Sequence, residues 1–286
     1  MQAGSKRVIV ITGPTASGKS ALAVDLAEQL GCDIISADSR QIFQGIPIVT
    51  AMPTDEERAR VRHHLIDMLP LTAYYSASKF EEDALQLINE QFEKSDTAIV
   101  CGGSMLYIDA LVNGIDFLPT VPEDFRKELK KEHGEKGDEW LLEELRRLDP
   151  DYFERVDHRN VKRVFHAVEI SKLTGKPYSG FLTGKRVKRP FEIEMRIIEM
   201  PRDVLFDRIN RRVDAMVEAG LEEEAQKVYP LRHLNSLNTV GLKEMFAYFE
   251  GKMKRDEAIE RIKKNTRVYA KKQLTWWNRK GCYKLK

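Results

Sequence analysis

Residues 13–20 read Gly-Pro-Thr-Ala-Ser-Gly-Lys-Ser, which matches the phosphate-binding P-loop pattern G-x-x-x-x-G-K-[ST] at every fixed position. The preceding residues, 8–12, form a short apolar, β-branched run that predicts a buried parallel strand. The following residues, 21–27, are helix formers with apolar side chains at helical spacing. A glycine loop between a strand and a helix aims backbone N–H groups and the positive end of a helix dipole at one point. The chain is therefore predicted to bind a di- or triphosphate group, as nucleotide-binding and ATP-binding P-loop proteins do.

The whole loop is predicted to contact the phosphate group. Lys19 brings a full positive charge, and Ser20 brings a hydroxyl that suits Mg²⁺ and is the predicted metal ligand. The P-loop alone leaves open whether the bound group is hydrolysed, transferred or displaced. The predicted diphosphate- and nucleotide-binding residues are Gly13, Pro14, Thr15, Ala16, Ser17, Gly18, Lys19 and Ser20.

The composition is typical of a globular protein of one large or two modest domains. The chain has 286 residues, of which 42% are hydrophobic and 32% charged. We expect no contact with a membrane, because no apolar run approaches the ~20 residues that span a bilayer and the N-terminus lacks a signal-peptide pattern. The three cysteines, Cys32, Cys101 and Cys282, lack metal-ligand spacing. Core packing or a free thiol is their expected role, which fits a cytoplasmic location.

The first 114 residues predict an α/β fold with a P-loop NTPase-like parallel sheet. Short apolar strands are expected at 8–12, 32–36 and 97–101, with a helix at 80–92 whose apolar residues form one stripe. Alternating strands and helices place helices on both faces of a parallel sheet. The three strand ends carry the informative loops, and ligands bind at such ends in open α/β sheets.

The pattern changes after Gly114, where charged helical segments replace the alternation. Residues 119–189 are predicted to be a helical insertion domain with helices near 123–148 and 160–173, so that 1–118 and 190–286 form the P-loop core with basic C-terminal helices. Alternation at period two predicts that 191–198 returns to the sheet as a strand. Further helices are expected at 204–219, 221–228, 242–249 and from 256 onward.

Two groups outside the P-loop could carry chemistry. Asp38 follows the second predicted strand, where a carboxylate could act as a base, a metal ligand or a ribose-binding group, or could only cap a turn. Arg208 and Arg212 are four residues apart on one predicted helix and could converge on a phosphate, although a solvated basic face is the commoner explanation for a cluster that also contains Arg211. The pair His63-His64 lacks further ligands, so packing is expected there rather than metal binding.

The C-terminal segment suggests a polyanionic partner. Residues 263–286 contain nine Lys or Arg residues and no Asp or Glu, and the basic residues at 263/264, 267 and 271/272 form a stripe on a helix. The adjacent Trp276 and Trp277 favour contact with RNA, where phosphate contacts combine with aromatic stacking. A surface helix whose tryptophans pack inward is the alternative.

Taken in order, these motifs resemble the tRNA dimethylallyltransferase family, whose members prenylate the adenosine next to the anticodon. The similarity extends over nearly the whole chain, and its most specific blocks are 35–42, Ile-Ser-Ala-Asp-Ser-Arg-Gln-Ile, and 266–276, Thr-Arg-Val-Tyr-Ala-Lys-Lys-Gln-Leu-Thr-Trp. Further matches are His-His-Leu-Ile-Asp at 63–67, Gly-Gly-Ser-Met-Leu-Tyr-Ile at 102–108, Thr-Gly-Lys-Pro at 174–177, Arg212 through Gly220-Leu221, and Val-Gly-Leu-Lys-Glu at 240–244.

The resemblance implies transfer of a dimethylallyl group from dimethylallyl diphosphate to N6 of the adenosine 3′-adjacent to the anticodon, with Mg²⁺ as cofactor. It implies that Asp38 is the base, because an aspartate carboxylate is ionised at neutral pH. Lys19 and Arg212 would stabilise the leaving diphosphate. The chain would act as a monomer on the tRNA anticodon stem-loop. The implied tRNA-binding residues are Asp38, Ser39, Arg40, Gln41, Ser104, Arg126, Lys162, Arg163, His166, Asn238, Thr239, Val240, Gly241, Leu242, Lys243, Lys271, Lys272, Gln273, Thr275 and Trp276.

Two positions depart from the family pattern. Ser104-Met105 stands where Thr-Gly or Thr-Met is usual, and Ser keeps the hydroxyl. Met52 replaces a usual lysine, which removes whatever phosphate or RNA contact that lysine makes.

Three other functions would use part of the sequence. A P-loop kinase of a small molecule or nucleotide explains residues 1–114 but leaves the basic tail unused. An RNA-binding protein without catalysis, or one driven by ATP, explains the tail but gives Asp38 no role. An isopentenyltransferase acting on free adenine nucleotides needs neither the tail nor the insertion.

Overall fold

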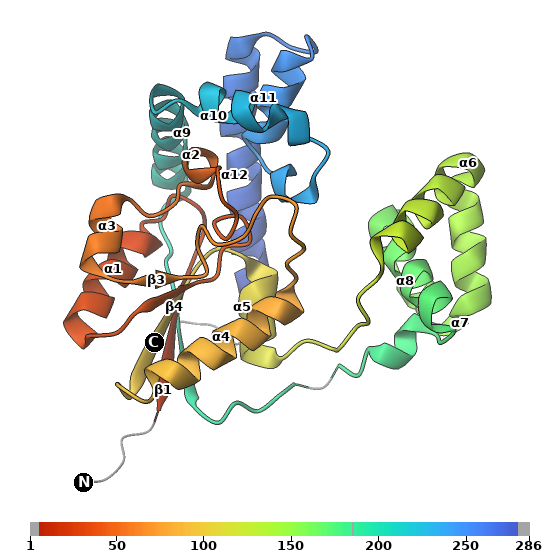
Figure 1. The fold of residues 1–286 in the computed structure, drawn as a ribbon, viewed down its shortest axis with the longest axis horizontal. Helices are drawn as coiled ribbons and strands as arrows, with labels where there is room; N and C mark the ends of the chain where they lie inside the picture. The colour runs from red at the N-terminus through yellow and green to blue at the C-terminus, as the bar shows by residue number, and fades with distance from the viewer. Residues whose placement is uncertain (1–5, 185, 280–286) are drawn as a thin grey trace. The chain divides into compact units, whose positions relative to one another are not determined.

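The computed structural model describes residues 6–184 and 186–279, which divide into two compact units. We call Met1–Asn113 with Lys188–Lys286 the sheet unit and Gly114–Val187 the helical unit (Figure 1). The predicted insertion, 119–189, spans nearly the same residues as the helical unit. Within the described residues, no helix has both the length and the apolar character to cross a bilayer. Cys282 and the last basic residues of the tail lie outside the described residues.

The sheet unit contains a five-stranded sheet in the order β3-β2-β4-β1-β5, with every pair parallel. The predicted α/β fold with a parallel sheet is therefore confirmed, including the return of the chain to the sheet after the insertion. The strand β3 escaped prediction because two residues carry no periodicity. The strands are β1 (Arg7–Thr12), β2 (Ile34–Ser36), β3 (His63–His64), β4 (Thr97–Cys101) and β5 (Glu192–Ile197).

Helices fill most of the remaining sheet unit, and the predicted ones occur within a few residues of their expected ends. Three short helices, α2, α3 and α5, were not predicted. The helix α3 begins with a capping box formed by Thr54 and Glu57. The helices are α1 (Lys19–Leu30), α2 (Pro47–Thr50), α3 (Asp55–Arg60), α4 (Ala77–Gln91), α5 (Met105–Asn113), α9 (Arg202–Glu218), α10 (Leu221–Val228), α11 (Leu242–Phe249) and α12 (Arg255–Arg279), with 3₁₀ turns η2 (Tyr229–Leu231) and η3 (Asn235–Leu237).

The helical unit has its own core. It comprises α6 (Glu123–Leu148), α7 (Pro150–Arg155), α8 (Val161–Thr174) and the 3₁₀ turn η1 (Tyr178–Phe181). The helical pattern predicted for 123–148 is confirmed, with an interruption at Gly137, whose φ of 83° and ψ of −179° are not helical. Side chains from α6, α7 and α8, among them Leu145, Phe153 and Val168, pack together in the interior.

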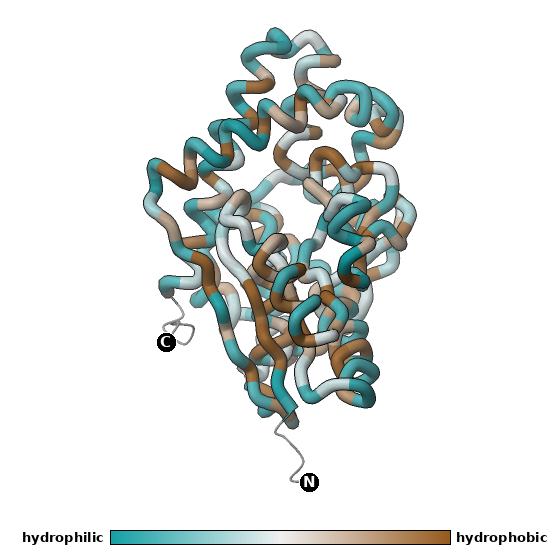
Figure 2. The backbone as a smooth tube through the Cα atoms, turned by 90° about the vertical axis from the view of Figure 1, so that its left-hand side faces the viewer, coloured by the Kyte–Doolittle hydropathy of each residue, from teal (hydrophilic) through white to brown (hydrophobic). Residues whose placement is uncertain are grey.

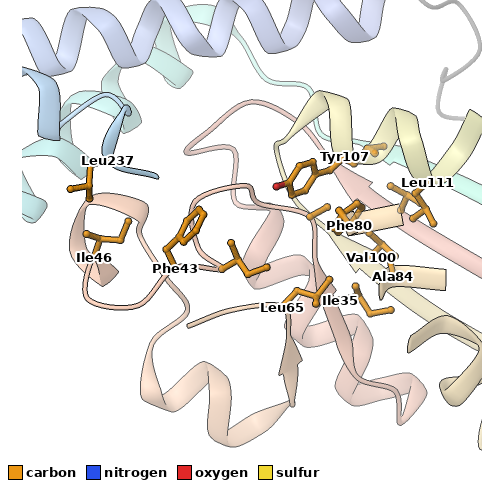
Figure 3. Packing of buried hydrophobic residues seen from close by; sticks show 14 of the residues in the cluster. Ile35, Phe43, Ile46, Leu65, Phe80, Ala84, Val100, Tyr107, Leu111 and Leu237 are labelled. Carbon is orange, nitrogen blue, oxygen red and sulfur yellow. The ribbon is translucent and has the colours of Figure 1, made fainter. Parts of the chain in front are cut away.

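The inner strand β1, between β4 and β5, shows that the sheet is covered on both faces. Val8 and Val10 pack into one hydrophobic cluster, whereas Ile9 and Ile11 pack into another, and all four are fully buried. In Figure 2, the first strand after the N-terminus is largely brown, whereas the helices alternate between brown and teal. Figure 3 shows how side chains of β2, β4, α4 and α5 meet in the larger cluster, where the rings of Phe80 and Tyr107 stack at 4.5 Å.

The carboxyl ends of the strands continue their hydrogen bonding into the loops that follow. The Gly102 N–H donates to the Ile11 carbonyl at 3.1 Å, and the Ala37 N–H donates to the Cys101 carbonyl at 2.8 Å. A β-carbon on Gly102 would lie 2.1 Å from the Ala37 oxygen, so only glycine allows the loops after β2 and β4 to approach this closely. The three predicted functional loops therefore meet at one edge of the sheet.

Candidate active site

A cavity of about 580 Å³ lies in the sheet unit at this edge. This volume falls within the range of about 300–1,000 Å³ that is usual for small-molecule sites. Its walls come from the P-loop, from the loops after β2 and β4, and from α9, the segment 238–244 and α12. Segments far apart in the sequence thus contribute to one site.

The P-loop presents free donors at the start of α1. Gly18 precedes the helix with a φ of 93°, and no side chain caps the first turn. The first N–H groups of α1 therefore have no partner within the helix, which is the arrangement that binds anions at helix N-termini. Ala16 in the same loop has a φ of 64°, a strained conformation for a residue other than glycine.

Two cations and one carboxylate lie close together in the cavity. Lys19, Arg212 and Asp38 all line it. Burial and the positive charge of Arg212 lower the pKa of Lys19, and Asp38 opposes this effect. Burial likewise lowers the pKa of Arg212, again opposed by Asp38. Among the described residues, neither cation forms an ion pair with a carboxylate, so an anionic ligand would satisfy both.

Of the clustered arginines on α9, two face the P-loop side and one does not. Arg212 lines the cavity, and the Nη2 atom of Arg208 lies 3.2 Å from where a β-carbon on Gly18 would be. Arg211 is 78% exposed and pairs with Asp207 at 2.7 Å. Arg208 and Arg212, which are spaced i,i+4, therefore lie on the same side of α9 near the P-loop. Only Arg211 lies on a solvated face of the helix.

The Asp38 carboxylate is held by its own turn. Its Oδ1 atom accepts from the Arg40 N–H at 2.9 Å and from the Gln41 N–H at 3.4 Å. The sequence left open whether Asp38 caps a turn or has a functional role, and the geometry of its carboxylate allows both. Capping uses one oxygen and fixes the orientation of the carboxylate, while Oδ2 has no hydrogen bond to any other described residue.

The neighbours of Asp38 that were predicted to bind tRNA bond to the protein itself. Ser104 Oγ accepts from the Ser39 N–H at 2.8 Å. The Arg40 guanidinium donates to three carbonyl oxygens of segment 235–238, at 2.8, 3.1 and 3.3 Å. Gln41 Nε2 donates to the carbonyls of Thr50 and Ala51 at 3.2 and 3.0 Å. These side chains shape the cavity wall, and their contacts with tRNA stay predictions.

The segment 238–243 lines the cavity along most of its length. Asn238 and Lys243 are exposed, Thr239 and Val240 are half-buried, and the Leu242 side chain is fully buried. Any ligand contact at Leu242 must therefore use its backbone.

The residues of α12 differ in what they offer to a ligand. Lys271, Lys272 and Thr275 are exposed, and Lys272 also lines the cavity. Trp277 is only 3% exposed, as expected for one of the two tryptophans, while Trp276 is half-buried. Gln273 is 1% exposed and bonds to the loops of the sheet edge.

The predicted tRNA contacts of the helical unit lie on α6 and α8. Lys162 and Arg163 are exposed at the start of α8. Arg126 Nε and Nη2 donate to the two oxygens of Glu169 at 2.6 and 3.0 Å, and His166 Nδ1 lies 3.2 Å from the same carboxylate. The Glu169 side chain is only 2% exposed. This pairing gives Arg126 a structural role that the sequence did not indicate.

The two described cysteines are buried, and the histidine pair is hydrogen-bonded to the protein; Cys101 and His63 also line the cavity. Cys32 and Cys101 are buried free thiols, and burial raises the pKa of Cys101 to about 12. His63 bonds to the Val61 carbonyl at 2.9 Å, and His64 to Asp33 at 2.8 Å. No group of three or more potential His, Cys, Asp or Glu ligands occurs within residues 6–184 and 186–279.

Some residues that support or line the cavity were not singled out from the sequence. Glu224 on α10 accepts from the N–H groups of Ile48 and Val49, both at 2.8 Å, and so holds the segment next to Gln41. Tyr269 and Met216 line the cavity itself, whereas Glu224 does not. The two bonds of Glu224 join residues 176 and 175 positions apart, a separation over which periodicity carries no information.

An Mg²⁺ ion would find hard oxygen donors here. The Ser20 side chain is exposed to the cavity, and the Asp38 carboxylate faces the same space. Mg²⁺ is commonly bound by one or two protein oxygens together with phosphate oxygens and water, so these residues fit the ion if a diphosphate is present.

Comparison with known proteins identifies the family. The family model described as IPP transferase matches residues 41–280. The protein named tRNA dimethylallyltransferase 2 of Parabacteroides distasonis is 50% identical over 272 residues, which cover 95% of this chain and 91% of the relative. The tRNA dimethylallyltransferase of Cytophaga hutchinsonii is 44% identical over 275 residues, which cover 96% of this chain and 90% of the relative.

Solved structures agree with this result. The tRNA isopentenylpyrophosphate transferase of Bacillus halodurans is 39% identical with a TM-score of 0.68, covering 96% of this chain and 87% of that one. A eukaryotic dimethylallyltransferase described as acting on tRNA is 27% identical with a TM-score of 0.81, covering 95% of this chain and 70% of that one. The resemblance drawn from the motifs is confirmed: this chain belongs to the IPP transferase family, which includes the tRNA dimethylallyltransferases.

Proposed function

We propose that this protein transfers a dimethylallyl group from dimethylallyl diphosphate to N6 of the adenosine 3′-adjacent to the anticodon of a tRNA. One observation carries the assignment of roles: a carboxylate, Asp38, shares a cavity with two cations that have no carboxylate partner among the described residues, Lys19 and Arg212. Prenyl transfer from a diphosphate needs both a base and a site for a departing anion. A phosphate-binding site alone would not need the base.

The reaction breaks the bond between C1 of the prenyl group and the ester oxygen that joins it to the diphosphate, and forms a bond between C1 and N6. The electron pair of the broken bond leaves with diphosphate, and the N6 proton passes to Asp38. The exocyclic amine is a weak nucleophile, because its lone pair is delocalised into the adenine ring. A base that accepts the proton as the C–N bond forms therefore lowers the barrier. Asp38 Oδ2 suits this role, since Oδ1 is already held by the turn.

In this mechanism the P-loop holds a leaving group, and no phosphoryl group is transferred. Charge develops on the diphosphate as it departs, so donors that are already oriented stabilise the transition state more than the ground state. The N–H groups at the start of α1, the Lys19 ammonium and the Arg212 guanidinium are such donors. Mg²⁺ bound through Ser20 and the diphosphate would add further positive charge to the leaving group.

The adenine must leave the stacked anticodon loop to reach Asp38. Turning a base out of a loop costs a few kcal/mol, which stacking and polar contacts offset. Exposed cations beside the cavity, Lys243, Lys271 and Lys272, are suited to contact phosphates of the anticodon stem-loop. Lys162 and Arg163 of the helical unit are proposed to make further backbone contacts.

The setting of the reaction is also a proposal. The protein is proposed to work as a monomer in the cytoplasm, which agrees with the buried free thiols of Cys32 and Cys101.

The test is to incubate the protein with dimethylallyl diphosphate, Mg²⁺ and an unmodified anticodon stem-loop. We expect one prenylated adenosine per stem-loop and release of diphosphate. Separate reactions with AMP, ADP or ATP as acceptor test the free-nucleotide alternative, and ATP with simple acceptors tests the kinase alternative. Prenylation of free nucleotides at a rate equal to that of the stem-loop would contradict the proposal.

A further inference from the structure

The side chain of Gln273 joins three elements that are remote in sequence. Gln273 lies on α12 and is 1% exposed. Its Nε2 atom donates to the Gly103 carbonyl at 2.9 Å, and its Oε1 atom accepts from the Thr15 N–H at 2.8 Å. A primary amide is the side-chain group that offers a donor and an acceptor on one rigid plane. Both halves of the Gln273 amide are therefore used inside the protein.

Both partners belong to loops that form the proposed site. Thr15 is in the P-loop, and Gly103 is in the loop after β4. A β-carbon on Gly103 would lie 2.6 Å from Gln273 Nε2 and 3.7 Å from Lys19 Nζ, so the amide and the ammonium border the same stretch of backbone. The next residue, Ser104, accepts from the Ser39 N–H beside Asp38. A continuous set of contacts thus leads from α12 to the leaving-group site and to the base.

The P-loop needs support of this kind. Ala16, next to Thr15, has a φ of 64°, a left-handed conformation that is strained for a residue other than glycine. Inside the loop, the Ser17 N–H donates to the Pro14 carbonyl at 3.2 Å, and no side chain caps α1. The bond from Thr15 to Gln273 fixes the loop beside its strained residue before any ligand arrives.

We propose that Gln273 is a positioning residue that sets the P-loop and the loop after β4 relative to each other, so that α12 determines where the diphosphate leaves relative to Asp38. The proposal rests on the proposed function for its effect on catalysis, but its effect on diphosphate binding is independent of it. The family resemblance implied a tRNA contact for Gln273. Positioning differs from that role, because the amide is buried and bonded on both sides.

Replacement by methionine tests the proposal, because Gln273→Met keeps the shape of the side chain and removes both bonds. Gln91→Met is the matched control. Gln91 is 8% exposed on α4, bonds to the Asp33 carbonyl at 3.3 Å and does not line the cavity. The readouts are the Kd for inorganic diphosphate with Mg²⁺ by calorimetry, kcat/KM for dimethylallyl diphosphate, the Kd for an anticodon stem-loop, and Tm.

We expect Gln273→Met to weaken diphosphate binding and lower kcat/KM for dimethylallyl diphosphate by about ten- to a hundred-fold, the usual effect of a misplaced catalytic group. Its affinity for the stem-loop should stay within about two-fold of the wild type, as no contact with RNA is lost. Gln91→Met should change Tm only. Gln273→Met with wild-type diphosphate binding and kcat/KM would overturn the proposal. If the wild-type protein binds diphosphate more tightly than Gln273→Met yet prenylates no tRNA, the proposed function alone is overturned.

A second variant keeps the proposal falsifiable if the methionine variant does not fold. Gln273→Glu retains the acceptor for Thr15 but, when ionised, places a second acceptor against the Gly103 carbonyl. When protonated, the introduced acid donates to that carbonyl and restores both bonds. The activity of Gln273→Glu divided by that of the wild type at the same pH should therefore rise as the pH falls. A ratio that does not change with pH would contradict the positioning role.

Discussion

Two arginines of this protein, Arg212 in the sheet unit and Arg126 in the helical unit, were predicted as functional residues but differ in their partners. Arg126 forms a two-point ion pair with the buried carboxylate of Glu169. Arg212 lines the cavity, and among the described residues it has no carboxylate partner. Burial lowers the pKa of Arg212, which means that the surrounding protein disfavours its charge.

The difference distinguishes Arg126, whose charge the protein itself compensates, from Arg212, whose charge a bound ligand could compensate. A charge that is wholly or partly withdrawn from water is costly unless an opposite charge compensates it. In the helical unit, the buried Glu169 carboxylate and the partly exposed Arg126 compensate each other. In the cavity the compensating anion must come from outside, and a diphosphate has the required charge.

The largest effect is expected for Asp38→Asn, which removes the base but keeps the turn. The asparagine oxygen still accepts the Arg40 N–H, so the loop after β2 should keep its shape. A general base contributes about 10²–10⁴ to the rate, and we expect single-turnover prenylation to fall by that factor. Binding of tRNA and of dimethylallyl diphosphate should stay within a few-fold. A folded variant with a normal single-turnover rate would exclude Asp38 as the base.

The next effect concerns the two cations of the cavity. Lys19→Ala and Arg212→Ala should each lower kcat/KM for dimethylallyl diphosphate by about 10²–10³, the cost of losing one oriented donor to a developing anion. Arg211→Ala is the matched control on the same helix, because Arg211 is 78% exposed and pairs with Asp207. Exposed pairs of this kind are worth little, so the control should be near wild type. Equal losses in Arg211→Ala and Arg212→Ala would remove the distinction between the two arginines.

Local signals made much of this site predictable. The P-loop pattern located the phosphate site, since strand, glycine loop and helix follow one another directly in the sequence. Asp38 was singled out because it follows an apolar run, and the carboxyl ends of parallel strands meet at one edge. Ser104 was named only because the family resemblance implied it. The spacing of Arg208 and Arg212 indicated a common face.

Long-range contacts made the rest unpredictable. Nothing in the pattern around Gln273 indicates that its amide reaches Thr15, 258 residues away, because hydrogen bonds between distant elements leave no periodic trace. The pairing of Arg126 with Glu169 was hidden for the same reason. Short elements such as β3 and α2 were missed because two to four residues contain too few positions to show a period.

A smaller effect, on stability, is expected in the helical unit. Burial raises the pKa of the Glu169 carboxyl, but the bonds from His166 and Arg126 outweigh it, so the pKa is lowered overall. Because the pKa of Glu169 is lower in the folded state than its unfolded value of about 4.3, the ionised carboxyl stabilises the folded protein at pH values above about 4.3. This stabilisation is lost as the pH falls through the folded-state pKa. Glu169→Gln should therefore cost about 1–3 kcal/mol at pH 7, as charged hydrogen bonds are lost.

Denaturant unfolding at several pH values measures this cost. The difference between Glu169→Gln and the wild type should shrink below about pH 4, where the wild-type carboxyl also takes up its proton. Arg126→Gln gives the matched comparison. If the role of Arg126 is structural, both variants should lose similar stability and bind the anticodon stem-loop equally. Weaker stem-loop binding in Arg126→Gln alone would show that the arginine also contacts RNA.

The smallest effect is expected on α12, where paired and unpaired cations occur on one helix. Lys263 is 15% exposed and bonds to Asp214 and Glu260, whereas Lys271 and Lys272 are exposed and have no carboxylate partner among the described residues.

Each phosphate contact contributes about one unit to the slope of log Kd against log salt. Lys272→Gln, at the cavity, should therefore weaken stem-loop binding by a few-fold and reduce this slope by about one. Lys271→Gln should do so less, since its Nζ atom already lies 5.5 Å from the Phe206 ring centre. Lys263→Gln should leave the slope unchanged, because its charge is already compensated. Equal slopes for Lys263→Gln and Lys272→Gln would show that the partners of a cation do not decide its role on this helix.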